Sequence, residues 1–197
     1  MSDRLILLDI PGVLYSASSA TRLGGTPDSG TLKDVRFFDP VALGFIRRLF
    51  GLAGARVVVS DHWRRGIPAA ILQQLDLQVE DMMPPAPGGF GAEIAAYFAK
   101  RPAPSAYVIL SAAPDSLQPQ QLAHLVSVDP AQGLTPDGFR RALDVLGVGC
   151  PSGMCLDVQP HPELAERLRQ LQQLARLAPE RFGPAAPAAA PATLFHS

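Results

Sequence analysis

Asp9 is the first residue of this sequence that is placed to do chemistry. It follows the apolar run Leu5-Ile6-Leu7-Leu8 and precedes Ile10-Pro11-Gly12, where a Pro-Gly pair ends the run. A short apolar run between a charged residue and such a breaker is typical of a fully buried strand. Ligands bind at the carboxyl edge of open α/β sheets, which is where the Asp9 carboxylate is expected. The pattern therefore predicts a ligand site at Asp9.

A second cluster of chemically active residue types is Ser60-Asp61-His62, after the β-branched run that ends at Val59. Serine, aspartate and histidine make hydrolytic triads, but those side chains converge from separate parts of a chain and three consecutive residues rarely do so. Ser60 is equally suited to cap the helix that follows it. His62 has no ligand-type partner at metal-binding spacing, so neither a triad nor a metal site is predicted here.

Arg64 and Arg65 lie just before a predicted helix, where arginine and the helix-terminal amides are able to bind a phosphate group. The alternative is an exposed pair that is solvated or forms surface salt bridges, and this is the commoner role of such residues. Both roles stay open from the sequence.

Apolar runs and helical patterns alternate along the chain. Strands are predicted at residues 5–8, 55–60, 77–79, 106–110 and 125–128, and helices at 40–50, 68–75, 91–100 and 136–146. Residues 15–38, rich in Ser, Gly and Thr, are predicted to be irregular or at most a small hairpin. Strands that alternate with helices favour a parallel sheet with right-handed crossovers.

The composition excludes several functional classes. With 17 basic and 18 acidic residues the net charge is -1, which does not support binding to nucleic acid or to an anionic membrane. Cys150 and Cys155 form neither a disulfide framework nor a zinc site, so free thiols are expected. The first apolar run is too short for a signal peptide, and no later one approaches a membrane span. These features lead us to expect a soluble, cytoplasmic protein.

The C-terminal part has a different composition. Residues 162–177 carry leucines at spacings of three or four with polar residues between them, which predicts an amphipathic helix. Its leucine face is expected to pack on its own domain or, less often, on a protein partner or a second copy of the chain. Residues 179–197 are dominated by Pro and Ala, as in disordered tails. We expect a domain at 1–149, the helix region at 150–178 and the tail at 179–197.

Six segments, taken in order, carry a family resemblance. They are Leu-Asp-x-x-Gly-Val-Leu at 8–14, Phe-x-Pro at 38–40, Val-Val-Val-Ser-x-x-Trp-Arg at 57–64, Glu-Ile-x-x-Tyr-Phe at 93–98, Tyr-Val-Ile-Leu at 107–110 and Gly-Leu-Thr at 133–135. Together they resemble the haloacid dehalogenase (HAD) type domain associated with Swiss-army-knife RNA repair proteins. The resemblance covers about residues 5–146. It implies a Rossmann-like three-layer α/β fold with a minimal cap, to which the C-terminal helix is added.

The same resemblance implies roles for the residues of the first two motifs. Asp9 takes the position of the nucleophile, which attacks phosphorus to form an acyl-phosphate. The acid that protonates the leaving oxygen in the family stands two residues later, where this chain has Pro11. Ser60 fits the hydroxyl at the end of the second strand. Gly12 and Arg64 are the residues to which we assign substrate binding.

The third and fourth motifs have lost their charges. The family cation aligns with Phe90, and the pair of aspartates that holds magnesium aligns with Ser111-Ala112. Asp115 is the nearest remaining acid, so Asp9 and Asp115 are the candidate ligands of a weak Mg²⁺ site. Because phosphoryl transfer depends on cations that stabilise the developing charge, these losses predict a catalytically impaired protein that acts by binding.

The alternative hypothesis is an active magnesium-dependent phosphohydrolase. It would use Asp9 as the nucleophile and would have rebuilt its metal site with Asp61 and Asp115. Substrate, partner and biological process are not predictable from the sequence.

Overall fold

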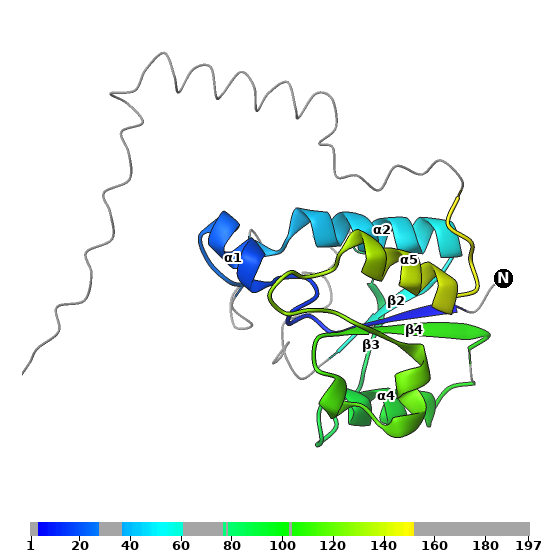
Figure 1. Ribbon diagram of the computed structural model, residues 1–197. Helices are drawn as coiled ribbons and strands as arrows, with labels where there is room; N and C mark the ends of the chain where they lie inside the picture. The colour runs from blue at the N-terminus through cyan, green and yellow to red at the C-terminus, as the bar shows by residue number, and fades with distance from the viewer. Residues whose placement is uncertain (1–3, 28–36, 61–76, 78, 103, 152–197) are drawn as a thin grey trace, which may run out of the picture. The chain divides into compact units, whose positions relative to one another are not determined.

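The computed structural model describes residues 4–27, 37–60, 77, 79–102 and 104–151. The described strands form one parallel sheet in the order β3-β2-β1-β4-β5 (Figure 1). Their bounds are β1 Arg4–Leu8, β2 Arg56–Val59, β3 Val79–Met82, β4 Ala106–Ser111 and β5 Leu125–Ser127. The first strand is central, as in doubly wound α/β domains. The predicted Rossmann-like fold class is confirmed.

Burial on both faces explains why the central strands are apolar throughout. Ile6, Leu7 and Leu8 of β1 are completely buried, and so are Val108, Ile109 and Leu110 of β4. Parallel strands covered by helices on both sides have no solvent face, so they show continuous apolar runs instead of alternation. This is the pattern that made both strands visible in the sequence.

Helices cover both faces of the sheet. α2 (Pro40–Ala53) and α5 (Pro136–Val145) lie on one face, and α4 (Phe90–Phe98) lies on the other (Figure 1). Between α2 and α5, the rings of Phe45 and Phe139 stack with centroids 5.3 Å apart. Both of these helices begin at the predicted proline, and the side chain of the preceding residue, Asp39 or Thr135, caps the helix.

One prediction about the connections was wrong. The segment expected to be irregular contains a seven-residue helix, α1 (Ala17–Leu23). Ser16 and Ser19 bond each other's backbone amides at 3.1 and 2.8 Å, which forms a capping box, and Gly24 ends the helix with φ of 81°. Two serines in place of the usual Ser and Glu, in a helix with few apolar residues, left no periodic signal in the sequence.

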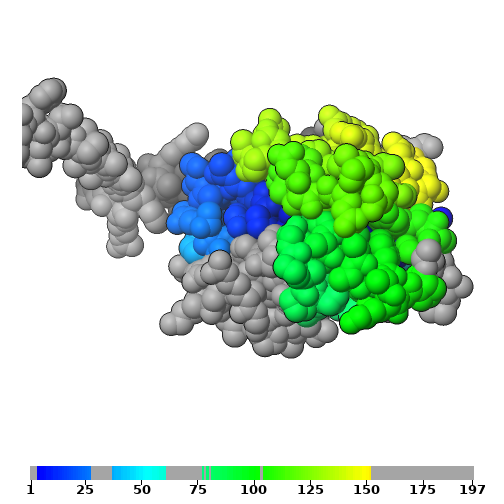
Figure 2. All heavy atoms as spheres, turned by 90° about the horizontal axis from the view of Figure 1, so that it is seen from below, coloured from blue at the N-terminus to red at the C-terminus, as the bar shows by residue number. Residues whose placement is uncertain are grey.

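Backbone contacts fix α1 to the carboxyl edge of the sheet. The amides of Ala17 and Ser18 donate to the carbonyls of Pro130 and Ala131, each at 3.0 Å. Figure 2 shows this blue N-terminal segment against the yellow-green residues that follow β5. The first loop of the chain is therefore bound to the loop that precedes α5.

The third strand also differs from its prediction. It was expected at residues 77–79 with a loop from Met82, but β3 runs from Val79 to Met82, with an irregularity in its pairing to β2. Glu80 and Asp81 in the middle of this edge strand hid it from a search for apolar runs. The predicted helices at 68–75 and 162–177 lie outside the described residues.

The chain divides into two units, residues 1–156 and 157–197, and every described residue belongs to the first. The predicted domain boundaries at 149 and 178 stay predictions. Within the described part of the chain, no helix has both the length and the apolar character needed to cross a membrane.

Candidate functional site

The carboxyl ends of three adjacent strands bring the predicted site residues side by side. Asp9 directly follows β1, Ser60 directly follows β2, and Ser111 is the last residue of β4. The amide of Ser60 donates to the Leu8 carbonyl, and the amide of Asp9 donates to the Leu110 carbonyl, both at 3.0 Å. Because the strands are parallel and in register, Ser60, Asp9 and Ser111 form one row across the sheet edge.

Asp9 is held by hydrogen bonds to both of its carboxylate oxygens. The amide of Ile10 donates to Oδ1 and the hydroxyl of Ser111 donates to Oδ2, each at 2.9 Å. The Ser111 oxygen also accepts from the amide of Ala113 at 3.1 Å, and this bond orients the hydroxyl hydrogen toward Asp9. Asp9 is 2% exposed, so this contact lies in a buried environment. A neutral donor therefore contacts the carboxylate at the position where the resemblance expects an acid.

Ser60, unlike Asp9, has a side chain without a hydrogen-bond partner among the described residues. This side chain is completely buried. A buried hydroxyl without a partner costs roughly 1–3 kcal/mol, so native structures seldom keep one without a reason.

The loop after Asp9 packs closely on the loop after β4. Gly12 has φ of 75°, and a Cβ atom built on it would lie 2.3 Å from the Cβ of Ala112. Only glycine combines this backbone conformation with such a close approach. The observed role of Gly12 is thus to let the two loops meet beside Asp9, and its assignment to substrate binding stays a prediction.

Two other sequence candidates are not members of this row. Phe90 begins α4 and is 1% exposed within the apolar cluster between α4 and the sheet. Asp115 lies in a short 3-10 helix, Pro114–Ser116, and is exposed. Asp61 and Arg64 are outside the described residues. Among the residues that are described, no three His, Cys, Asp or Glu side chains are grouped to hold a metal ion.

The sequence predicts that Asp9, Ser60 and Ser111 lie together at the carboxyl ends of three neighbouring strands, but it does not predict the hydrogen bond from Ser111 to Asp9. The available signal was that each of these residues directly follows an apolar run. The register between β1 and β4 then places Asp9 and Ser111 opposite each other.

A comparison with protein families identifies the domain. The model of the HAD domain in Swiss Army Knife RNA repair proteins matches residues 5–139. The chain belongs to this family. No protein of curated function matches the chain significantly. One solved crystal structure matches 94% of this chain and 100% of its own, at 18% identity and a TM-score of 0.35, a similarity too distant to inform on function.

HAD domains commonly use Mg²⁺, so the donor set of this HAD domain can be tested for its fit to that ion. Mg²⁺ takes oxygen ligands and is usually held by one or two carboxylates together with water and substrate phosphate. The described row offers one carboxylate, Asp9, whose two oxygens already accept hydrogen bonds, and the hydroxyls of Ser60 and Ser111. With one carboxylate, this set meets only the lower end of what the ion takes, and no chemical step is assigned to a metal here.

The contact between Gly12 and Ala112 gives a first testable prediction. Gly12→Ala should lower the free energy of unfolding by about 2–4 kcal/mol, because it adds a steric overlap to the strain of a positive φ. Gly54→Ala is the matched control: φ is 57° at Gly54 and nothing lies within 4 Å of the added Cβ. It should cost about 1 kcal/mol. Urea unfolding of both variants measures the difference.

The double variant Gly12→Ala, Ala112→Gly should recover most of that difference, because it removes the Cβ atom that the added methyl group would meet. Equal losses in the two single variants, or no recovery in the double variant, would contradict the close approach of the two loops.

The two serines of the row give a second prediction. Ser111→Ala should lower the free energy of unfolding by about 1–3 kcal/mol, because it removes the hydrogen bond to a buried carboxylate. Ser60→Ala should leave the free energy unchanged or raise it by up to about 1 kcal/mol, since it deletes an unsatisfied hydroxyl. Thermal and urea unfolding test the pair. A loss in Ser60→Ala as large as that in Ser111→Ala would mean that Ser60 is hydrogen-bonded in solution.

Proposed function

We propose that this HAD domain is catalytically impaired and acts by binding, as a structural, regulatory or ligand-sensing subunit. The observation that carries the proposal is the hydrogen bond from Ser111 to Asp9. At this position the family resemblance expects a carboxylate that holds magnesium. Here Ser111 stands at that position, and its hydroxyl donates a hydrogen bond to Oδ2 of Asp9, the candidate nucleophile.

The chemistry of phosphoryl transfer explains why this exchange matters. The developing charge on the transferring group is stabilised mainly by cations, and the loss of one such partner typically slows a reaction by about a hundredfold or more. Pro11 has no proton to give to a leaving oxygen. Phe90, aligned with the family cation, is an apolar side chain buried in the core. Each of these changes acts on a different part of the same reaction.

Two features support a binding role at the same edge. Asp9 keeps its place after the central strand, and the Ser60 hydroxyl beside it is buried without a partner among the described residues. A ligand with a hydrogen-bond acceptor would satisfy Ser60 and so gain affinity from a group that otherwise destabilises the fold. We propose that any Mg²⁺ at Asp9 and Asp115 binds weakly, in the millimolar range or worse, as expected for a site with one or two carboxylates.

The alternative proposal is an active phosphohydrolase with Asp9 as its nucleophile. The same buried aspartate and the adjacent hydroxyl of Ser60 favour it, because these are the two catalytic positions that the resemblance preserves. It requires further metal ligands, for which the candidates are Asp61, outside the described residues, and the exposed Asp115.

Hydrolysis of an aryl phosphate in the presence of Mg²⁺ separates the two proposals. The wild-type protein should show no turnover above that of an Asp9→Asn variant, because the acid and the cation of the reaction are missing. Both proteins are purified in parallel and compared with and without a chelator. Metal-dependent turnover that disappears in the Asp9→Asn variant would refute impairment and establish the phosphohydrolase.

For partners we propose that residues 162–177 use their leucine face against the domain, a protein partner or a second copy of the chain. Five leucines left in water would form an apolar patch of several hundred Å², roughly the limit for soluble monomers. We also propose a cytoplasmic location, which the cysteine usage supports.

Replacing Leu168 and Leu171 by Arg should therefore change the sedimentation coefficient or promote aggregation. Replacing Gln172 and Gln173 by Arg, which a period of 3.6 residues places outside the leucine face, is the matched control and should change neither. Identical sedimentation of the leucine variant and the wild type would argue against a packed leucine face.

A further inference from the structure

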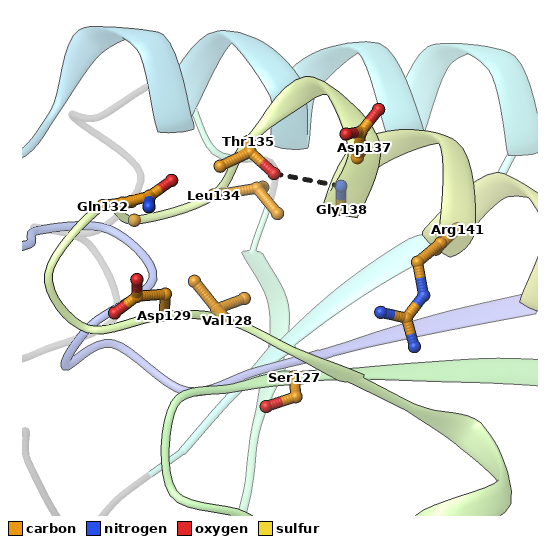
Figure 3. Close-up of a pocket in the computed structure, with 10 residues that line it drawn as sticks. Ser127, Val128, Asp129, Gln132, Leu134, Thr135, Asp137, Gly138 and Arg141 are labelled. Carbon is orange, nitrogen blue, oxygen red and sulfur yellow. Dashed lines mark hydrogen bonds between the residues drawn. The ribbon is translucent and has the colours of Figure 1, made fainter.

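A small pocket lies beside β5, away from Asp9. It has a volume of about 190 Å³ and is lined by the residues that follow β5 and by the first turns of α5 (Figure 3). Val128 and Leu134 supply apolar wall, while Ser127 and Arg141 supply hydrogen-bonding groups. A space of this size suits a small metabolite but not a nucleotide.

The charged side chains that line the pocket differ in the ion pairs and hydrogen bonds that they make. Asp137 pairs with Arg140 at 2.6 Å, and its side chain points away from Val128 in Figure 3. Asp129 accepts a hydrogen bond from the amide of Ala131 at 2.8 Å within its own turn. Arg141, by contrast, makes no hydrogen bond or ion pair with any described residue, and its guanidinium extends from α5 toward the strand side of the pocket (Figure 3). Asp129 keeps its negative charge, but its carboxylate points away from Arg141 in Figure 3, so the charge on the Arg141 side of the pocket is positive.

We propose that this pocket binds the oxyanion group, carboxylate or phosphate, of a small molecule through Arg141, with the rest of the molecule against Val128 and Leu134. Guanidinium presents paired N–H donors that match the geometry of both groups. The hydroxyl of Ser127, on the pocket lining, is a further donor. The proposal does not use the amino end of α5, because the side chain of Thr135 already accepts from the amide of Gly138 at 3.2 Å.

The pocket is separate from the row at Asp9. Ser127 pairs in register with Ser111, which itself lies beside Asp9, so two strand spacings, about 10 Å of sheet, separate Ser127 from Asp9. The loop after β5 nevertheless contacts the loop that follows Asp9. The carbonyl of Pro130 accepts from the amide of Ala17, and the Cα of Pro130 lies 3.5 Å from a Cβ built on Gly12. The pocket proposal does not depend on the function proposed for Asp9.

Titration of the full chain with inorganic phosphate and with succinate, followed by ¹⁵N NMR at low ionic strength, tests the proposal. At least one of the two anions should bind and shift the amide signals of Ser127 and Gly138. Arg141→Gln should weaken this binding about tenfold to a hundredfold, as expected for the loss of charge-assisted hydrogen bonds. Arg48→Gln, which removes one exposed charge on α2, is the matched control and should change affinity less than about twofold.

Three outcomes would overturn the proposal. The first is that neither anion binds in the millimolar range. The second is that Arg48→Gln weakens binding as much as Arg141→Gln, which would mean that anion affinity depends on the net charge of the protein and not on Arg141. The third is that binding depends on Asp9, so that Asp9→Asn abolishes the shifts while Arg141→Gln does not. Preferential binding of phosphate or of succinate would support the proposal and define the anion.

Discussion

The parallel register of three strands is the constraint on which the rest of this structure depends. Leu8 of β1 lies opposite Val59 of β2 and Leu110 of β4, so the next residue of each strand falls in the same row. The backbone bonds that continue this register fix Asp9 between two hydroxyls. Since a slip by one residue would turn every side chain to the opposite face, the apolar core that sets the register also sets the site.

Close backbone contacts then determine the shape of the carboxyl edge. Gly12 lets the first loop rest on Ala112, and the amide of Ala17 binds the loop after β5 through Pro130. On the other side of α1, Arg22 pairs with Asp39 at 2.7 Å at the start of α2. Helix α1 is therefore fixed near both of its ends by the elements that surround it. Its position follows from these contacts and not from its weak helical propensity, because seven-residue helices are not stable alone.

The sequence predicted most of the sheet and the position of Asp9, because buried parallel strands produce apolar runs that are easy to find. The elements that were missed or misplaced are those without an apolar pattern. The helix α1 is built by Ser16 and Ser19, which cap without periodicity, and the edge strand β3 contains Glu80 and Asp81. The bond from Ser111 to Asp9 joins residues 102 positions apart, so it became visible only with the register in hand.

The residue at position 111 determines how the buried negative charge of Asp9 is stabilised. A carboxylate there would lie about 3 Å from that of Asp9 in a buried place, and two such charges are compatible only if a proton or a cation lies between them. Ser111 replaces the second charge with a donor whose hydrogen is directed to Asp9 by the amide of Ala113. Asp9 is then stabilised by the protein's own groups. Among the described residues, this row therefore folds around one buried carboxylate, whose charge is stabilised by hydrogen bonds from the protein itself.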